Sequence, residues 1–292
     1  MNWILLTLAA AGIEAISNVF DRFFLKNDTK QPDSLLGIWG VFALIMFCTP
    51  ALISQTVSLD STVILFGLLA GAIYILAMHF YYQAIARAEV TRIVPILSLG
   101  PMIIVVGASL FFQEAHTILQ FIGIGIILLG MTIEAFDNIS HKFIARQAII
   151  FMSLAAILFA TKNLLAKGLS LESSNPLNVL FWVGWGVFIF SLPYLFKHRK
   201  EVFRARQKLQ VNFCLAAALA ASCTMLYTSA TLIGPAGLVA FLHRIEIFFV
   251  FIIAQVIDYR HPKLLKEKFN KKAFWQKLIG VLLIFIGSFF LM

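Results

Sequence analysis

The chain has 292 residues, of which 61% are hydrophobic and only 13% are charged, and its formal net charge at pH 7 is +9. An ordinary soluble domain has about 25% charged residues, so this composition excludes a water-soluble globular fold. The excess of Lys and Arg does not indicate a nucleic-acid partner, because it is concentrated in particular connections, as in membrane proteins of defined topology.

Long apolar segments recur along the whole chain. A membrane helix needs about 20 mostly apolar residues to cross the hydrocarbon layer. The sequence therefore predicts an all-α polytopic membrane protein with ten transmembrane helices, at 2–24, 35–54, 61–84, 93–112, 117–136, 148–167, 177–196, 209–231, 237–257 and 274–292. The connections between these segments are too short to hold a second, soluble domain.

The first apolar segment is expected to be a helix of the mature protein. It has no basic start and no small-residue cleavage site of the kind that a secretory signal carries. The three cysteines, Cys48, Cys214 and Cys223, lie in apolar surroundings without metal-ligand spacing. We therefore expect no disulfide framework, no metal and no cofactor.

Positive charge follows the odd-numbered connections. Roughly 19 of the 23 Lys and Arg residues lie after the first, third, fifth, seventh and ninth segments, which the positive-inside rule places in the cytoplasm. Both termini would then face outward. The basic run at 259–277 is expected to contact anionic lipid headgroups rather than nucleic acid.

The two halves of the sequence share short motifs in the same order. Trp-Gly-Val-Phe occurs at 39–42 and again at 185–188, each time in a helix preceded by a proline, and a Gln followed by two spaced glycines opens the fifth and tenth segments. Five helices separate the matched positions, and five is odd, so the second half enters the membrane from the opposite face. This indicates two inverted five-helix repeats, 1–137 and 138–292, an architecture that supports alternating access to a central site.

The end of the first repeat resembles that of the EamA-type transporters of the drug/metabolite transporter superfamily. The residues that carry the resemblance are Tyr82, Gln83, Ala84, Ile85, Ala88, Pro95, Pro101, Glu114, Gln120, Gly123 and Gly130. The second copy is more diverged: Tyr227, Ala230, Gly234, Pro235 and Asp258 fit, but Arg244 and Glu246 stand near the positions of Ser98 to Pro101. The resemblance implies export of amino acids, related metabolites or drugs. Members are often drawn with cytoplasmic termini, the reverse of the charge count.

Polar residues in the first helix share one face. Glu14, Asn18 and Asp21 are spaced by four and three, Arg22 follows directly, and Glu14 lies near mid-depth. A charge facing lipid there costs about 3 kcal/mol, so these side chains are expected to point inward. They either form helix-to-helix hydrogen bonds or bind solute, and we expect Glu14 to exchange protons.

The ninth segment contains His243, Arg244 and Glu246. Because Arg244 and Glu246 are two residues apart, an ideal helix would direct their side chains to nearly opposite sides. Each is therefore predicted to pair with another helix: Arg244 with Glu14 or Asp21, and Glu246 with Lys162 or Arg22. These groups either hold an anionic or zwitterionic solute and relay a proton, or form a static lattice of salt bridges.

Aromatic residues are further candidates for solute contact. Trp39 and Trp185 are related by the repeat, and tyrosines lie on the third and eighth segments, where they would face one cavity and stack on a planar or cationic solute. The alternative is an interfacial belt or packing, which also applies to the histidine of the third segment. The candidates are Trp39, Tyr74, His79, Tyr81, Tyr82, Trp185 and Tyr227.

Glycines and prolines are expected to shape the helix contacts. Gly67 and Gly71 permit close backbone approach, and the spaced glycines of the fifth and tenth segments predict that these two helices meet. Pro95 and Pro101 are predicted to bend the fourth helix near its middle and to act as a hinge.

These features together predict a secondary active transporter that moves a small organic metabolite across the cytoplasmic membrane, by gradient-driven export. The sequence contains no nucleotide-binding loop. Expected partners are a small-molecule solute, membrane lipids and protons, with no nucleic acid. The alternative is a membrane-embedded enzyme or assembly factor, although the charged residues are spread over several helices rather than clustered as a catalytic site.

Overall fold

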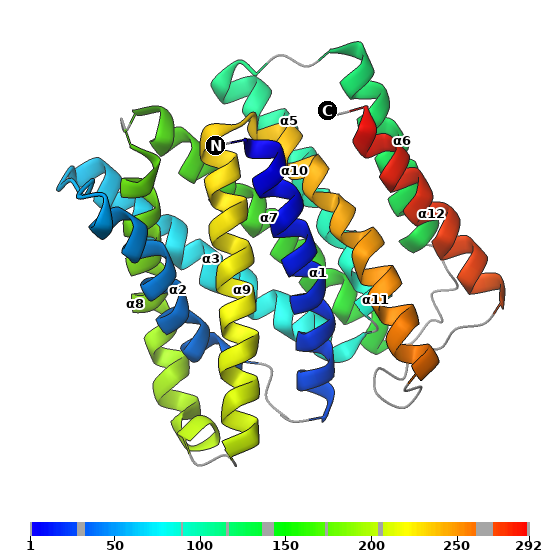
Figure 1. Cartoon of the computed structure of the whole chain (residues 1–292), viewed down its shortest axis with the longest axis horizontal. Helices are drawn as coiled ribbons and strands as arrows, with labels where there is room; N and C mark the ends of the chain where they lie inside the picture. The colour runs from blue at the N-terminus through cyan, green and yellow to red at the C-terminus, as the bar shows by residue number, and fades with distance from the viewer. Residues whose placement is uncertain are drawn as a thin grey trace.

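The computed structural model describes residues 2–27, 33–88, 90–114, 117–135, 143–172, 175–203, 207–260 and 271–290. Over these residues the chain is helical and contains no strand (Figure 1). The helices are α1 (Trp3–Asn27), α2 (Ser34–Ile53), α3 (Ser61–Arg87), α4 (Val90–Ile93), η1 (Val94–Ser98), α5 (Leu99–Phe112), α6 (Ile118–Ala135), α7 (Phe143–Glu172), α8 (Pro176–Phe203), α9 (Gln207–Ile233), α10 (Ala236–Leu242), η2 (His243–Ile245), α11 (Glu246–Arg260) and α12 (Lys271–Phe289).

Seven described segments are long and apolar enough to cross a membrane. They are Trp3–Asp21, Ser34–Ile53, Ser61–Arg87, Arg146–Leu171, Pro176–Arg199, Cys214–Ile233 and Ala236–Ile257, and three shorter apolar helices accompany them, Leu99–Phe112, Ile118–Gly130 and Leu278–Gly287. Large apolar side chains such as Ile53, Phe111 and Ile118 are more than 70% exposed, which suits a lipid-facing surface. The chain is an integral, multi-pass membrane protein, as predicted.

The predicted fourth and ninth helices are interrupted rather than continuous. The fourth consists of α4, the 3₁₀ turn η1 and α5, and Pro95 lies at the start of η1. Proline lacks an N–H donor, so the ladder of α-helical hydrogen bonds is interrupted there, near the start of the predicted helix rather than near its middle. Pro101 lies in the first turn of α5, where no helical hydrogen bond depends on its N–H. The prediction that Pro95 and Pro101 act as a hinge stays a prediction.

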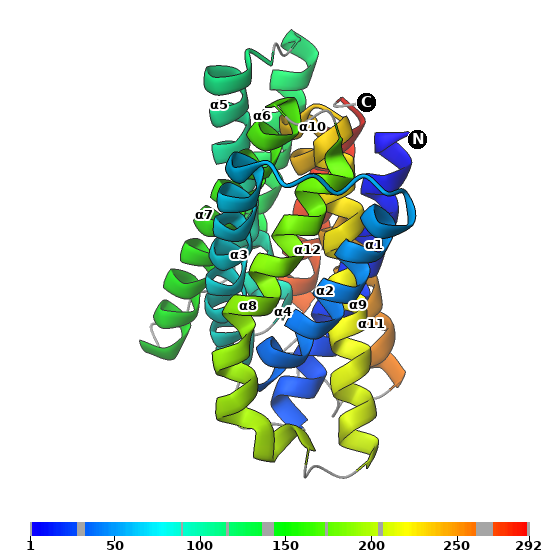
Figure 2. The ribbon, with the colours of Figure 1, turned by 90° about the vertical axis from the view of Figure 1, so that its left-hand side faces the viewer.

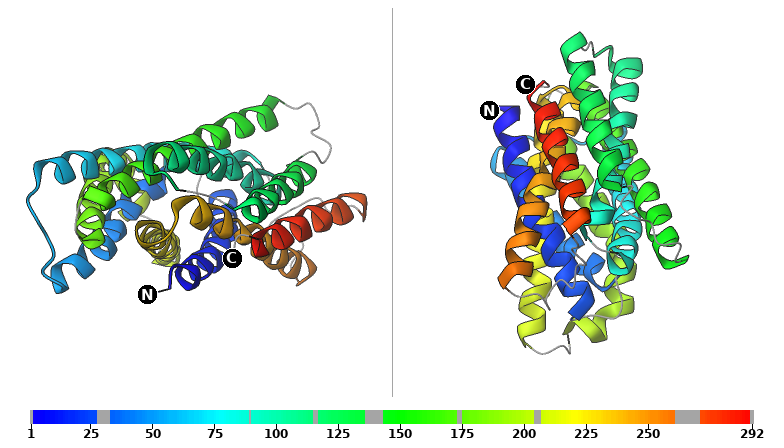
Figure 3. Two further views of the ribbon diagram at one scale, coloured as in Figure 1. Left: turned by 90° about the horizontal axis from the view of Figure 1, so that it is seen from above. Right: turned by 90° about the vertical axis from the view of Figure 1, so that its right-hand side faces the viewer.

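Most helices run along a common axis, and both ends of the chain lie at the same end of the bundle (Figures 1 and 3). The closest helix pairs join segments that are far apart in sequence. α2 packs on α8 and α3 on α7, as seen from the side in Figure 2, while α1 packs on α9. α6 packs on α12 at one edge of the bundle, which the view from above in Figure 3 shows.

Glycines set the closest helix contacts. A Cβ atom built on Gly130 would lie 2.5 Å from the carbonyl oxygen of Gly280, and one built on Gly287 would lie 2.7 Å from that of Gly123. The predicted meeting of the fifth and tenth segments is therefore confirmed. Gly67 and Gly71 of α3 likewise face Trp182 and the backbone of Gly186, both on α8.

Gly130→Ala is expected to destabilise the protein by about 1–3 kcal/mol, because the backbone of α12 must move away from the added methyl group. Gly125→Ala is the matched control on the same helix, since a Cβ atom there meets nothing within 4 Å. Thermal unfolding in detergent compares the two variants. Equal unfolding temperatures would show that this glycine contact does not limit helix packing.

Some sequence features lie outside the described part of the chain. The features left out are Pro32, most of the basic run at 259–277, and the side chains of Arg22 and Asp258. Their predicted roles stay predictions.

Candidate functional site

A cavity of about 90 Å³ lies among α1, α3, α5, α7, α9 and η2. This volume holds several water molecules or part of a small solute. Its polar lining consists of Glu14, Ser17, Asn18, Asp21, Tyr74, Tyr81, Lys162, Asn163, Cys223, Thr224, Tyr227, His243 and Arg244. The cavity thus collects charged and hydroxyl side chains within a chain that is otherwise mostly apolar.

The polar face of α1 forms one wall of the cavity. Glu14, Asn18 and Asp21 all line it, so their predicted shared inward face is confirmed. Asn18 Oδ1 accepts a hydrogen bond from the hydroxyl of Tyr81. Asn18 Nδ2 and Asp21 Oδ1 have no hydrogen-bond partner among the described residues, although both side chains are about 99% buried. Unpaired buried polar atoms are costly, so this wall offers a donor and an acceptor to an occupant.

Lys162 of α7 forms the second charged corner. Its ammonium donates to Thr228 Oγ1 at 2.8 Å and to Asn163 Oδ1 at 3.2 Å, and lies 5.3 Å from the centre of the Tyr74 ring. The Tyr74 ring also stacks on the ring of Trp39, at a centroid distance of 4.6 Å and an interplanar angle of 12°. The corner is therefore rigid.

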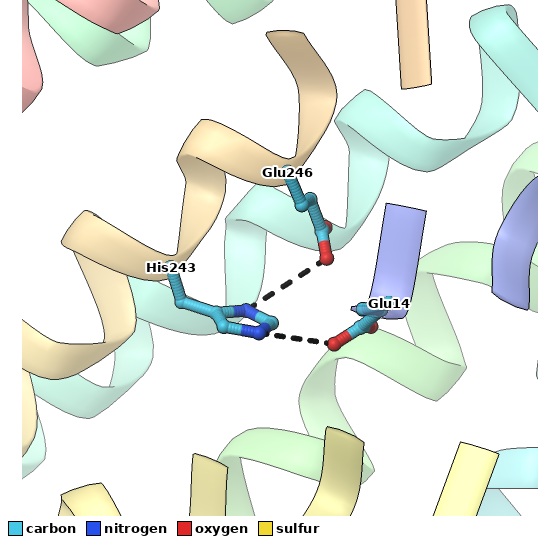
Figure 4. Close-up of side chains that lie close together, drawn as sticks. All are labelled: Glu14, His243 and Glu246. Carbon is cyan, nitrogen blue, oxygen red and sulfur yellow. Dashed lines mark ion pairs between the residues drawn. The ribbon is translucent and has the colours of Figure 1, made fainter. Parts of the chain in front are cut away.

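A cluster of titratable side chains joins α1 to the start of α11 (Figure 4). His243 Nε2 lies 3.1 Å from Glu14 Oε2, and His243 Nδ1 lies 3.7 Å from Glu246 Oε2. Arg244 Nη2 lies 3.0 Å from His243 Nδ1, and Arg244 Nη1 lies 2.8 Å from Glu246 Oε1. Glu246 is fully buried, whereas the Glu14 side chain is 23% exposed. The four residues contact one another in series, and three of them, Glu14, His243 and Arg244, line the cavity.

The predicted partners of Arg244 and Glu246 are wrong, because these two residues pair with each other. The segment His243–Ile245 is a 3₁₀ turn, in which successive side chains are separated by about 120° rather than 100°. The angle between side chains two residues apart, seen along the helix axis, is therefore smaller than in an α-helix. The long Arg244 side chain can then reach the Glu246 carboxylate. Lys162 pairs with neutral groups and not with Glu246.

Several candidates from the sequence do not line the cavity. Trp39 and Tyr82 are fully buried but are not among its lining residues, and Trp185 is 36% exposed on α8 beside Phe188. His79 pairs with Asp33 instead. Trp39 supports Tyr74 and does not itself stack on a solute in this arrangement.

The threonines of α9, which form a row of hydroxyl groups with Tyr227, were not predicted from the sequence. Thr224 lines the cavity and contacts the Tyr74 hydroxyl at 2.6 Å, and Thr228 accepts a hydrogen bond from Lys162. Thr224, Tyr227, Thr228 and Thr231 follow a spacing of three and four, which marks one face of a helix. This spacing was a usable signal, but single threonines in apolar helices usually bond to their own backbone.

A second group of polar contacts joins Glu114 and Lys167 to the region between α9 and α10. Glu114, which follows α5, accepts hydrogen bonds from the backbone N–H groups of Ala236 at 3.0 Å and Gly237 at 3.3 Å, at the start of α10. Lys167 of α7 donates to the carbonyl of Gly234 at 2.8 Å. The turn between α9 and α10 is thus held from two other helices.

Asp33, just before α2, is held by α3. His79 Nδ1 lies 2.9 Å from Asp33 Oδ1, and Gln83 Nε2 donates to the same oxygen at 3.1 Å. Partial burial alone would raise the pKa of Asp33, but the hydrogen bond and the charge of His79 outweigh it and hold the pKa below its usual value. The contact therefore stabilises the ionised form and ties α2 to α3.

Asp33→Asn is expected to lower the unfolding temperature at neutral pH and to have little effect in acid. A lowered folded-state pKa stabilises the protein above the ordinary pKa of about 4, and this stabilisation is lost as pH falls through the folded value. Unfolding curves of the parent and variant from about pH 6 to pH 2 should converge at the acid end. A difference that stays constant over this range would contradict the assignment.

Comparison with known proteins shows what the chain is similar to. Residues 1–134 match the EamA-like transporter family. An Escherichia coli protein named probable amino-acid metabolite efflux pump is 30% identical over 142 residues, covering 45% of this chain and 48% of that protein. An uncharacterized protein of Methanocaldococcus jannaschii is 27% identical over 79 residues, covering 27% of this chain and 58% of its own length. The matched regions thus span about half the length of these curated relatives.

A solved structure, described only as the crystal structure of a protein, has a TM-score of 0.69 to this chain. The match covers 99% of this chain and 95% of the other, at 11% sequence identity, so it supports the fold alone. The match of residues 1–134 to the EamA-like transporter family agrees with the resemblance drawn from the sequence motifs.

Proposed function

We propose that the chain is a secondary active carrier that exports an amino acid-like or drug-like metabolite across the cytoplasmic membrane by alternating access. The observation that carries this proposal is the cavity lined by charged side chains from α1, α7 and η2. Charged groups within a membrane bundle are costly unless they serve a solute or ion pathway. The name of the Escherichia coli relative, an amino-acid metabolite efflux pump, agrees with this class of solute.

Helix packing supports two inverted five-helix repeats. If α1, α2, α3, α5 and α6 are equivalent to α7, α8, α9, α11 and α12, the contact of α3 with α7 corresponds to that of α9 with α1. The contact of α5 with α7 corresponds in the same way to that of α11 with α1. The contacts of α2 with α8 and of α6 with α12 each join a helix to its own equivalent. A twofold axis in the membrane plane produces such contacts where a helix lies beside the axis.

Alternating access requires that one end of the bundle closes while the other opens. The contacts of Glu114 and Lys167 with the turn before α10 provide such a closed end. In an inverted repeat the corresponding position at the other end would be the turn between α3 and α4. We propose that the two ends open in turn around the cavity.

We propose that the coupling proton binds to the cluster formed by Glu14, His243, Arg244 and Glu246. A guanidinium group only donates hydrogen bonds, so the contact of Arg244 with His243 Nδ1 makes this nitrogen an acceptor. The ring proton of neutral His243 then lies on Nε2, toward Glu14. With two carboxylates and one guanidinium, the cluster is neutral when it holds one additional proton.

The same residue types also suit a metal ion, because Glu14, His243 and Glu246 offer ligand atoms within 4.8 Å of one another. A metal bound through Nδ1 would have to displace the Arg244 guanidinium, and one bound through Nε2 would leave Glu246 on the far side of the ring. We therefore favour a proton over a metal ion at this cluster.

The carrier is tested with purified protein in liposomes. Candidate solutes are first selected by the rise in unfolding temperature that binding produces. A carrier should then move the selected solute across the bilayer and release it chemically unchanged. Recovery of an altered solute would instead support the alternative of a membrane-embedded enzyme, and no flux of any binding solute would refute transport.

A further inference from the structure

Lys162 is a buried cation that faces the cavity without an anionic partner. Lys162 is only 1% exposed, and both hydrogen-bond partners of its ammonium group, Thr228 and Asn163, are neutral. Within the described part of the chain no carboxylate forms an ion pair with it. Arg244 differs in this respect, because it is paired with Glu246.

An unpaired buried ammonium group is unfavourable, since neutral partners replace only part of the water that it gives up. Ammonium has three N–H donors, and Thr228 and Asn163 use two of them. The third donor remains for an occupant of the cavity. The group is also held in place, because Tyr74 lies beneath it and is fixed by Trp39 and Thr224.

We propose that Lys162 is the anion subsite of the carrier and binds a carboxylate group of the transported solute. This inference rests on the proposed function, in which the cavity is the transport site. A carboxylate is favoured over a phosphate because Glu14 and Asp21 line the same cavity and would repel a doubly charged anion. Their position also leaves room on the α1 wall for a cationic group of the same solute.

The test compares solutes that differ only in this group. A panel of small L-amino acids is measured beside the corresponding carboxamides, in which a neutral amide replaces the carboxylate. The parent protein should show a rise in unfolding temperature with one or more acids, and each carboxamide should bind at least about tenfold more weakly than its acid. Lys162→Met should weaken binding of the acids by a similar factor and abolish the difference between acid and amide.

Two further variants separate binding from folding. Lys162→Arg keeps the positive charge and should retain a preference for acids over amides. Lys197→Met makes the same change as Lys162→Met at an exposed lysine of α8 that does not line the cavity, and should bind like the parent. Lys162→Met itself should unfold at no lower temperature than the parent, because it removes an unpaired buried charge.

Three results would overturn the anion subsite: carboxamides that bind as tightly as acids, a Lys162→Met variant that keeps the preference for acids, or a parent protein that no acid of the panel stabilises. A wrong assignment of the anion subsite can be distinguished from a wrong assignment of transport. Equal flux of acids and amides in liposomes would refute the subsite and leave the carrier intact. Binding of acids that requires Lys162, without flux of any solute, would refute the carrier and leave the subsite.

Discussion

Glu14→Gln is expected to reduce gradient-driven solute uptake into liposomes at least tenfold while solute exchange stays within about twofold of the parent rate. Glutamine keeps the size and hydrogen-bonding capacity of the side chain but cannot gain or lose a proton. Glu14 is the carboxylate of the polar cluster that lines the cavity, so a proton and a solute can both approach it. Uptake under an imposed pH gradient and exchange without a gradient measure the two activities separately.

The matched control is the same change at Glu114. This carboxylate caps the start of α10 and does not line the cavity, so Glu114→Gln should keep the ratio of protons to solute even if the rate falls. If Glu14→Gln supports gradient-driven uptake at the parent rate, Glu14 is a structural group and the coupling site lies elsewhere.

The pair of Arg244 and Glu246 is expected to have the largest effect on stability. Glu246→Leu leaves the buried Arg244 guanidinium without its nearest carboxylate and should destabilise the protein by about 3–5 kcal/mol. The double variant with Arg244→Met and Glu246→Leu removes both charges and should recover most of this loss. Unfolding in detergent of both single variants and the double variant gives the coupling energy of the pair. Losses that simply add would show that the two charges act independently.

The helical segments and the polar wall of α1 could be predicted from the sequence. The apolar segments and the spacing of Glu14, Asn18 and Asp21 depend only on the local sequence, which an unbroken helix preserves. Seven described segments are long and apolar enough to cross a membrane, and three further apolar helices are shorter. The close contact of α6 with α12 followed from spaced glycines in the same way, because a glycine row permits few other arrangements.

Contacts that depend on broken helices could not be predicted. The 3₁₀ turn at His243–Ile245 contains no proline or glycine that would mark it, yet it permits the contact between Arg244 and Glu246. The partner of Lys162 was also missed, because a lone threonine 66 residues further along the chain carries no charge pattern.

Aromatic residues were the least predictable part of the site. The predicted repeat pairs Trp39 with Trp185, but Trp39 is fully buried and Trp185 is partly exposed on the surface of α8. A repeat in sequence predicts equivalent backbone positions. It does not predict which side chains surround each of the two positions.

Counterflow in liposomes tests the central claim, that one cavity is exposed to each side of the membrane in turn. Liposomes that contain the protein are loaded with a high concentration of unlabelled solute and diluted into a trace of the same labelled solute, with no ion gradient. A carrier that alternates should accumulate the label transiently above its external concentration, and Lys162→Met should weaken this accumulation. Label that only equilibrates across the membrane, as through an open pore, or that does not enter at all, would contradict the account.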